Sequence, residues 1–182
     1  MILVRARGKE PPLTSGVLRV QSLKILGVIV DNKLNFSEHI DTVLTSCSQS
    51  LFAFRVMRQH GMSQQSLQLV FKASILSKLI YAVPAFRGFL SVVNLTRMQS
   101  FLNRAIKFGY YPPGDPDICD TISHFEHKLF NKIALNSNHV LHYMLPDLKH
   151  TFRNLRPTTH RYNLPRKDDR NFINRMLFVD IY

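Results

Sequence analysis

The sequence predicts an α+β protein that is mostly α, with a short N-terminal β-hairpin, a helical bundle and an irregular basic C-terminal arm. Before position 34 the apolar residues form short aliphatic runs typical of strands. From Asn35 onward they recur every three or four positions, which is the period of an amphipathic helix. We therefore expect four segments: strands over 1–34, a helical bundle over 35–111, further helices over 112–146, and an extended arm with a short terminal helix over 147–182.

The strand prediction rests on two runs. Val17–Val20 and Ile25–Val30 are rich in aliphatic residues, and only the polar pair Gln21 and Ser22 separates the first run from Leu23. This spacing favours a hairpin formed by the two runs. Gly27 falls in the middle of the second run, so the prediction is a buried strand with a glycine inside it.

The first helix is predicted to begin near Asn35 and to end at Gly61. Asn35 with Glu38 three residues later resembles a capping box, and a glycine is typical after a helix C-terminus. Apolar residues at helical spacing between these ends predict one packed face that includes Cys47: Ile40, Val43, Leu44, Cys47, Leu51 and Phe54.

The remaining helices are predicted from the same period and from the positions of proline and glycine. Pro84 must stop or kink the second helix, because proline lacks the amide hydrogen that the helix needs. Gly109 is predicted to close the third. The expected ranges are about Ser63 to Pro84, about Asn94 to Phe108, about Ser123 to Leu135, His139 to Leu145, and a last short helix around Phe172, Ile173, Met176 and Leu177.

Composition indicates a polyanionic partner and an intracellular protein. The 24 Lys and Arg residues against 12 Asp and Glu residues give a net charge of +12, for which nucleic acid is the leading partner and a merely solvated basic surface the alternative. Two cysteines are too few for a disulfide framework or a four-thiol zinc site. The apolar start is too short for a signal peptide, and we expect no membrane span, so the predicted localisation is nuclear or cytoplasmic.

Titratable residues give only weak candidates for catalysis or metal binding. Asp168 and Asp169 are adjacent but bracketed by cations, which favours a solvated ion-pair cluster or a helix N-cap over a catalytic pair. The possible metal ligands are the pairs His124 with His127 and His139 with His142, with Cys119, Asp120 or Glu126 as a third ligand, but we expect no metal site and no complete active site. A metal-dependent hydrolase that uses His124, His127 and Cys119 is the weakest of three hypotheses.

Cations spread along the predicted helices form the strongest candidate site. On the outward faces of neighbouring helices they can follow a phosphate backbone without reading bases. Aromatic residues lie near them in the sequence, namely Phe86, Phe89, Tyr110 and Tyr111. The predicted nucleic-acid-binding residues are Arg55, Arg58, Lys72, Lys78, Arg97, Arg104 and Lys107.

Three segments together resemble the C-terminal part of reverse transcriptases of non-LTR, LINE-type retrotransposons. They are Lys24–Leu34 followed by Glu38–Ile40, then Tyr81–Phe89, and finally Leu164–Phe172. In that family the Leu-Gly-Val strand belongs to the primer grip at the junction of palm and thumb, and the helices after it form the thumb. The resemblance therefore implies that residues 1–34 are a palm remnant and that Leu26, Gly27 and Val28 are primer-grip-like, with Gly27 allowing close approach of a primer backbone or a neighbouring strand.

The resemblance implies a binding function without catalysis. The family's catalytic aspartates have no counterpart here, so the chain is expected to be a fragment of an RNA-directed DNA polymerase that is not an enzyme on its own. It needs no cofactor, because Mg²⁺ would belong to the missing palm. The expected partner is RNA or an RNA–DNA duplex held through phosphates, with no membrane. The alternative is a helical protein-interaction domain or a decayed gene product without independent activity, which self-associates through Ile25, Val28 and Val30.

Overall fold

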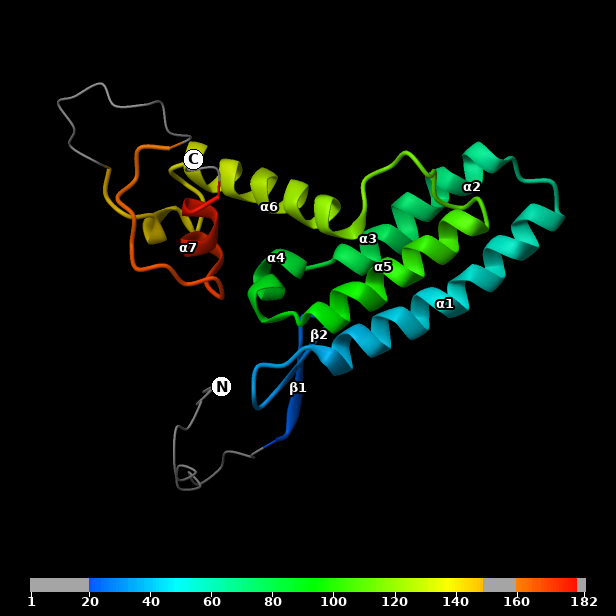
Figure 1. Cartoon of the computed structure of the whole chain (residues 1–182), viewed down its shortest axis with the longest axis horizontal. Helices are drawn as coiled ribbons and strands as arrows, with labels where there is room; N and C mark the ends of the chain where they lie inside the picture. Colours follow the sequence, from blue (N-terminus) through cyan, green and yellow to red (C-terminus); the bar gives the residue numbers. More distant parts are fainter. Residues whose placement is uncertain (1–19, 149–159, 180–182) are drawn as a thin grey trace. The chain divides into compact units, whose positions relative to one another are not determined.

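The computed structural model describes residues 20–148 and 160–179, which form two compact units (Figure 1). The first unit contains the chain up to Tyr81 and Phe89–Asp115, and the second contains Ala82–Gly88 and the chain from Pro116 onward. The prediction of a mostly helical α+β chain with an early hairpin is confirmed. The short segment Ala82–Gly88 thus belongs with residues far from it in sequence.

The hairpin of the first unit pairs β1 (Ser22–Ile25) with β2 (Val28–Asp31) in antiparallel register. Leu26 and Gly27 form its two-residue turn, with φ values of 47° and 89°, as a type I′ turn requires. The predicted continuous strand over Ile25–Val30 is therefore wrong, because Gly27 supplies a left-handed turn instead of a strand interior. Of the predicted partner strand, only Val20 is among the described residues, and it lies outside β1.

Helix α1 spans Ser37–Gln59, and its two ends are closed differently. The predicted capping box is wrong: Asn35 lies one residue before the N-cap Phe36, and its Oδ1 accepts a hydrogen bond from the Ser37 N–H at 3.1 Å. The predicted end at Gly61 is confirmed. Gly61 has a φ of 86°, and the following N–H, of Met62, donates to Met57 O, which is a Schellman motif.

The second helix of the bundle is a continuous rod of α2 (Gln64–Phe71), the π-helical η1 (Lys72–Leu76) and α3 (Ser77–Ile80), which we call the α2–α3 rod. Its predicted start is confirmed, since Ser63 Oγ accepts a hydrogen bond from Ser66 N–H at 3.2 Å. The rod ends at Ile80, before the predicted Pro84. Ala82 has a left-handed φ of 57°, and Pro84 lies in the first turn of the next helix, where a missing N–H costs little.

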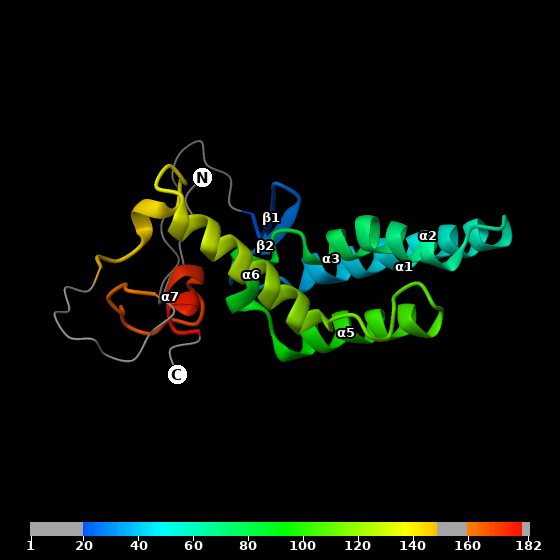
Figure 2. The same cartoon turned by 90° about the horizontal axis from the view of Figure 1, so that it is seen from above.

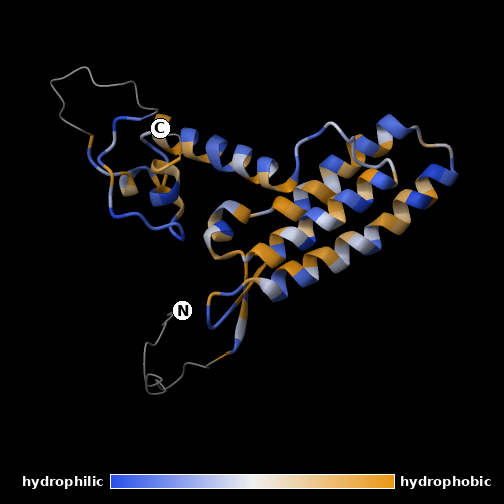
Figure 3. Cartoon of the chain, in the orientation of Figure 1, coloured by the Kyte–Doolittle hydropathy of each residue, from blue (hydrophilic) through white to orange (hydrophobic). Residues whose placement is uncertain are grey.

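Helix α5 (Val92–Lys107) completes the first unit. Ser91 Oγ caps its start by accepting a hydrogen bond from Asn94 N–H, and Gly109 follows its end with a φ of 73°. Helix α1 packs against both α5 and the α2–α3 rod (Figures 1 and 2). The apolar stripes of these helices make the core, which includes Ile40, Cys47, Phe54, Leu67, Phe71, Ile75, Leu79, Met98 and Leu102. Figure 3 shows that polar and apolar residues alternate along each helix.

The second unit is built from α4 (Val83–Phe86), α6 (Ile118–Leu135) and α7 (Phe172–Leu177), with the 3₁₀ turns η2 (Arg87–Phe89) and η3 (His142–Met144) nearby in sequence. Helix α6 starts earlier than the predicted Ser123, because Asp117 caps it. The predicted helix over His139–Leu145 is only η3, whereas the predicted terminal helix is confirmed as α7. The buried core cluster of the second unit consists of Phe130, Ile173, Met176 and Leu177.

Just after α4, the backbone at Gly88 lies very close to the backbone at Asp169. A Cβ added to Gly88 would lie 2.4 Å from the backbone oxygen of Asp169, so only glycine fits there. Within α7, Arg175 forms an ion pair with the buried Glu126 of α6. These two contacts connect the segment after α4 and helix α6 to the chain around α7.

Within the described residues, one helical stretch, Gln64–Phe89, is long and apolar enough to cross a membrane, judged by length and composition alone. No such run was predicted from the sequence. The finding is weak evidence, because core helices pass the same test. In this stretch the side chains of Leu67, Phe71, Ile75 and Leu79 are buried in the core of the first unit.

Candidate nucleic-acid interface

The central part of the chain carries positive charge only. Between Asp41 and Asp115 there are eight Lys and Arg residues and no Asp or Glu. All of α2, α3 and α5, and most of α1, fall in this interval. A polyanion that lies against these helices therefore meets a field of one sign.

Two adjoining grooves lie between α1 and α5, and together we call them the α1–α5 groove. The first has a volume of about 280 Å³ and the second about 560 Å³. They share Ser48 and Arg104, so the two are continuous. Their charged and exposed aromatic lining consists of Arg55, Arg58, Arg97, Arg104, Phe52 and Phe108.

Helical spacing explains why these residues meet. On α1 the lining residues recur every three or four positions, and so do those on α5, which places each set on one helix face. The α1 set is Leu44, Ser48, Leu51, Phe52, Arg55, Arg58 and Gln59, and the α5 side supplies Arg97, Ser100, Phe101, Arg104 and Phe108.

Four of the seven predicted binding residues line this groove, and three do not. Lys72 forms an ion pair with Asp115, and its Nζ lies 5.9 Å from the centre of the Tyr111 ring. Lys78 Nζ donates to Ser46 Oγ at 3.1 Å. Lys107 is exposed in the last turn of α5, and neither groove includes it. The seven predicted residues thus divide into four that line one groove and three that are separate from it.

Arg58 and Arg104 have structural contacts inside the groove. The Arg58 guanidinium lies 4.4 Å from the centre of the Tyr110 ring and donates to Phe108 O, at the end of α5. Arg104 donates to Ser48 Oγ on α1 at 3.0 Å. Both side chains therefore join α1 to α5 while still carrying a charge in the groove.

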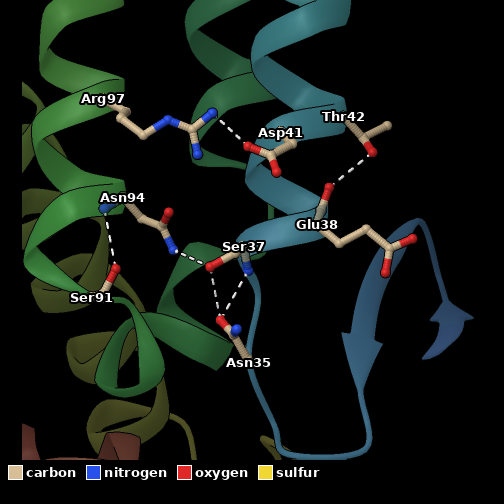
Figure 4. Close-up of polar contacts among 8 residues, drawn as sticks. All are labelled: Asn35, Ser37, Glu38, Asp41, Thr42, Ser91, Asn94 and Arg97. Atoms are coloured by element: carbon tan, nitrogen blue, oxygen red, sulfur yellow. Dashed lines mark hydrogen bonds and ion pairs between the residues drawn. The ribbon is translucent and has the colours of Figure 1, made fainter. Parts of the chain in front are cut away.

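Arg97 lies at the end of the groove where α1 and α5 begin, within a polar network (Figure 4). It forms an ion pair with Asp41 of α1. One turn earlier on α5, the Asn94 Nδ2 donates to Ser37 Oγ at 3.1 Å, and Ser37 Oγ donates to Asn35 Oδ1 at 2.9 Å. Asn94 is 2% exposed, so its amide is a buried link between the two helix starts.

Arg55 differs from the other three arginines. Its side chain is exposed, and within the described part of the chain no hydrogen bond or ion pair holds it to another residue. Its guanidinium is therefore available to a ligand in the groove without loss of an internal contact.

The aromatic residues expected beside the cations are mostly core residues. Phe86, Tyr110 and Tyr111 are buried and cannot stack on bases. The exposed aromatics in the groove are instead Phe52, which is 67% exposed, and Phe108, which is 41% exposed. The exposure of Phe52 could have been predicted from the sequence, because Phe52 lies outside the apolar stripe of α1.

The predicted primer-grip-like residues lie at the tip of the hairpin. Leu26 is 87% exposed, and its carbonyl oxygen accepts a hydrogen bond from the Tyr81 hydroxyl at 3.1 Å. A Cβ on Gly27 would lie 3.7 Å from Cε1 of Tyr81. Val28 is half-buried as the first residue of β2. The group that approaches Gly27 here is the Tyr81 ring, from the end of the α2–α3 rod.

Three of the candidate metal ligands, Glu126, His139 and His142, have other contacts. In the described ranges no group of three or more His, Cys, Asp or Glu residues is arranged to hold a metal ion. Glu126 pairs with Arg175. His139 Nδ1 accepts from Leu141 N–H at 3.1 Å, and His142 Nδ1 lies 2.7 Å from Ile133 O. The two histidines of the second pair thus take part in local backbone contacts after α6.

The remaining titratable candidates are structural as well. Asp168 Oδ1 accepts from Arg170 N–H at 2.9 Å, and Asp169 lies 3.8 Å from Lys167 in an exposed ion pair, as the solvated-cluster interpretation predicted. The N-cap of α7 is Asn171 instead. Burial raises the pKa of the Cys47 thiol to about 11, and Lys78 opposes this only in part, so Cys47 stays protonated in the core.

Comparison with known proteins gives no family for this chain. A scan against protein-family models, a search of curated proteins and a search of solved structures each found no match.

Proposed function

We propose that the chain binds RNA or an RNA–DNA duplex through its phosphates, as the thumb-like part of a LINE-type reverse transcriptase inside the cell. The observation that supports this most is the α1–α5 groove. Four arginines line it, and no carboxylate lies between Asp41 and Asp115 in the sequence. Arginine suits this role, because its planar guanidinium can donate two parallel hydrogen bonds to one phosphate.

The length of the groove fits a nucleic-acid backbone. Its lining on α1 runs from Leu44 to Gln59, which is about 22 Å at about 1.5 Å per residue. At about 3.4 Å of axis per nucleotide, that is room for about six steps of one strand. Contacts of this kind are independent of base sequence.

The proposed role is binding and not chemistry. No residue of the chain corresponds to the family's catalytic aspartates, so Mg²⁺ and polymerisation would belong to a palm supplied elsewhere. The chain would hold the template and primer while that palm acts. Under this proposal the hairpin tip at Gly27 faces the palm side of the thumb.

The first test is the salt dependence of binding by the full chain. With a fluorescein-labelled RNA–DNA duplex and anisotropy as readout, contacts to four to six phosphates give a slope of log K against log salt of roughly −3 to −5. A flat salt response would overturn the proposal.

Arg55→Gln against Lys107→Gln then separates the groove from general surface charge. The two changes remove the same charge from exposed side chains, one inside the groove and one outside it. We expect Arg55→Gln to reduce the slope by about 0.7 to 0.9 and the affinity at about 0.1 M salt by about five- to eightfold. Lys107→Gln should change both much less. Equal effects would favour the merely solvated basic surface.

A protein-interaction domain remains the second candidate, and one observation favours it. Three apolar side chains between the end of α6 and η3 are strongly exposed, namely Leu135 at 88%, Val140 at 77% and Tyr143 at 82%. The residues predicted to drive self-association, Ile25, Val28 and Val30, are half-buried. Concentration-dependent oligomers in light scattering, together with no affinity for nucleic acid, would support this candidate over the first.

A further inference from the structure

The larger half of the α1–α5 groove combines exposed aromatic rings with arginines. Phe52 and Phe108 line it together with Arg55, Arg58 and Arg104. Arginine alone would suffice to hold phosphates. Two exposed phenyl rings in the same groove add a flat apolar surface, which in nucleic-acid-binding proteins serves to stack unpaired bases.

Both rings are attached to rigid backbone. Phe52 lies in the interior of α1, one turn before Arg55. Phe108 follows the last turn of α5, where its carbonyl oxygen accepts the hydrogen bond from Arg58, and its ring centre lies 6.0 Å from that of the buried Tyr110. Neither ring lies on a loose loop, so little ordering is needed when a base stacks on it.

We propose that this half of the groove is a site for single-stranded RNA, in which Phe52 and Phe108 stack on unpaired bases and Arg55 and Arg104 hold the flanking phosphates. The inference rests on the proposed function and names its preferred ligand. Bases inside a duplex are stacked on one another and do not present a face to the rings. The ligand is therefore an unpaired stretch, such as a template strand beside the duplex.

The charge of the groove favours nucleic acid over an apolar protein segment as its occupant. A protein helix in the groove would have to cover three arginines, each of which needs hydrogen-bond acceptors when water is removed. The groove offers no carboxylate of its own, since Asp41 lies outside this half. An RNA strand supplies an acceptor with every phosphate and a ring with every base.

A double-mutant cycle between protein and RNA tests the stacking directly. The probe is a labelled single-stranded RNA of about six nucleotides, the number of steps for which the α1–α5 groove has room, and the same RNA with abasic nucleotides at its centre. Phe52→Ala should weaken binding of the intact RNA by about 5- to 150-fold, the range for loss of one stacked base. It should leave the salt slope unchanged, because no phosphate contact is lost.

The abasic RNA should bind the wild-type chain at least as weakly as the intact RNA binds Phe52→Ala, because it lacks the bases for both rings. Combining the abasic RNA with Phe52→Ala should add little to the effect of the abasic RNA alone. Phe52→Tyr should keep most of the affinity. Leu69→Ala is the matched control, because Leu69 is 70% exposed on α2 and lies outside the groove. Circular dichroism should show the same helicity for every variant, since each changes an exposed side chain.

The outcomes separate this inference from the proposed function. If the wild-type chain binds no nucleic acid, both are overturned. If binding depends on salt and on Arg55 but Phe52→Ala and the abasic RNA change nothing, the function stands and the single-strand site is wrong. In that case the two exposed rings serve another contact, such as a partner protein.

Discussion

The two ends of the α1–α5 groove are built in opposite ways. At the end where α1 and α5 begin, Asn94 is buried in a hydrogen-bond network and Arg97 is paired with Asp41. At the end where both helices finish, Arg55 has no such pairing and Phe52 is exposed. The polar side chains of the first end are paired with one another. At the second end Arg58 also joins α1 to α5, but the charge of Arg55 and the ring of Phe52 remain available to a ligand.

The direction of the helices accounts for this difference. The pairs Asp41 with Arg97 and Ser48 with Arg104 show that α1 and α5 run the same way. Both C-terminal ends therefore lie at the same end of the groove, where free carbonyl groups favour cations. The Arg58 guanidinium, for example, donates a hydrogen bond to the carbonyl oxygen of Phe108. Acidic residues are favoured at the other end, where Asp41 lies near the start of α1.

The largest expected effect comes from breaking the paired end. Asn94→Ala removes a buried amide that joins α5 to Ser37 of α1. We expect a loss of about 1 to 3 kcal/mol in the free energy of unfolding, because a buried hydrogen bond is lost and the Ser37 hydroxyl loses its donor. Urea unfolding followed by circular dichroism measures it.

Thr96→Ala is the control for Asn94→Ala. Thr96 is exposed on the same helix, and its hydroxyl donates only to Val92 O within that helix. Its replacement should change stability by no more than about 0.5 kcal/mol. If both variants lose the same amount, the Asn94 link does not hold the two helices together.

Much of this fold could be predicted from the sequence wherever a single residue determines where a helix begins or ends. Gly61 could be predicted to end α1, and Ser63 to begin α2, because a left-handed glycine and a serine cap act within a few residues. Gly27 could not be assigned so simply. A glycine among aliphatic residues fits both a strand interior and a type I′ turn, and only the pairing of Ile25 with Val28 decides between them.

The groove was only partly predictable. Arg55, Arg58, Arg97 and Arg104 were expected from their sequence spacing, but nothing local shows that Lys72 pairs with Asp115, across more than forty residues. Tyr110 was expected as an aromatic residue beside the cations, but it is buried, because Arg58 and the core of the first unit enclose it. Long-range contacts, not helix propensity, separate the groove residues from the other cations.

A smaller effect should follow from releasing the paired arginine. Asp41→Asn keeps the shape of the side chain but removes the charge that pairs with Arg97. Arg97 then becomes available as Arg55 already is. We expect the affinity for labelled RNA at about 0.1 M salt to rise by up to about fivefold, the value of about one additional phosphate contact.

Glu38→Gln is the matched control, since it removes the same charge from the start of α1 without touching Arg97. It should raise the affinity much less than Asp41→Asn. In an Arg97→Gln background the gain from Asp41→Asn should disappear. Equal gains for Glu38→Gln and Asp41→Asn would mean that only the net charge matters and that the ion pair does not restrain Arg97.

The smallest effect concerns pH near the start of α1. His39 is 5% exposed in α1, and burial lowers the pKa of its imidazole, with Lys24 lowering it further. In the unfolded chain a histidine has a pKa of about 6.5, so below that pH the unfolded state binds the proton more readily. The contribution of His39 to stability is therefore fully present above about pH 6.5 and is lost as pH falls through its lower folded pKa.

Urea unfolding at about pH 7.5 and at about pH 5.5 measures this contribution. We expect the wild-type chain to lose more stability on acidification than His39→Gln, which has no proton to take up at that position. His60→Gln replaces an exposed histidine just after α1 and should behave as the wild type does. If His39→Gln loses as much stability as the wild type, His39 is protonated in the folded chain at no cost, and its burial near the start of α1 does not make stability depend on pH.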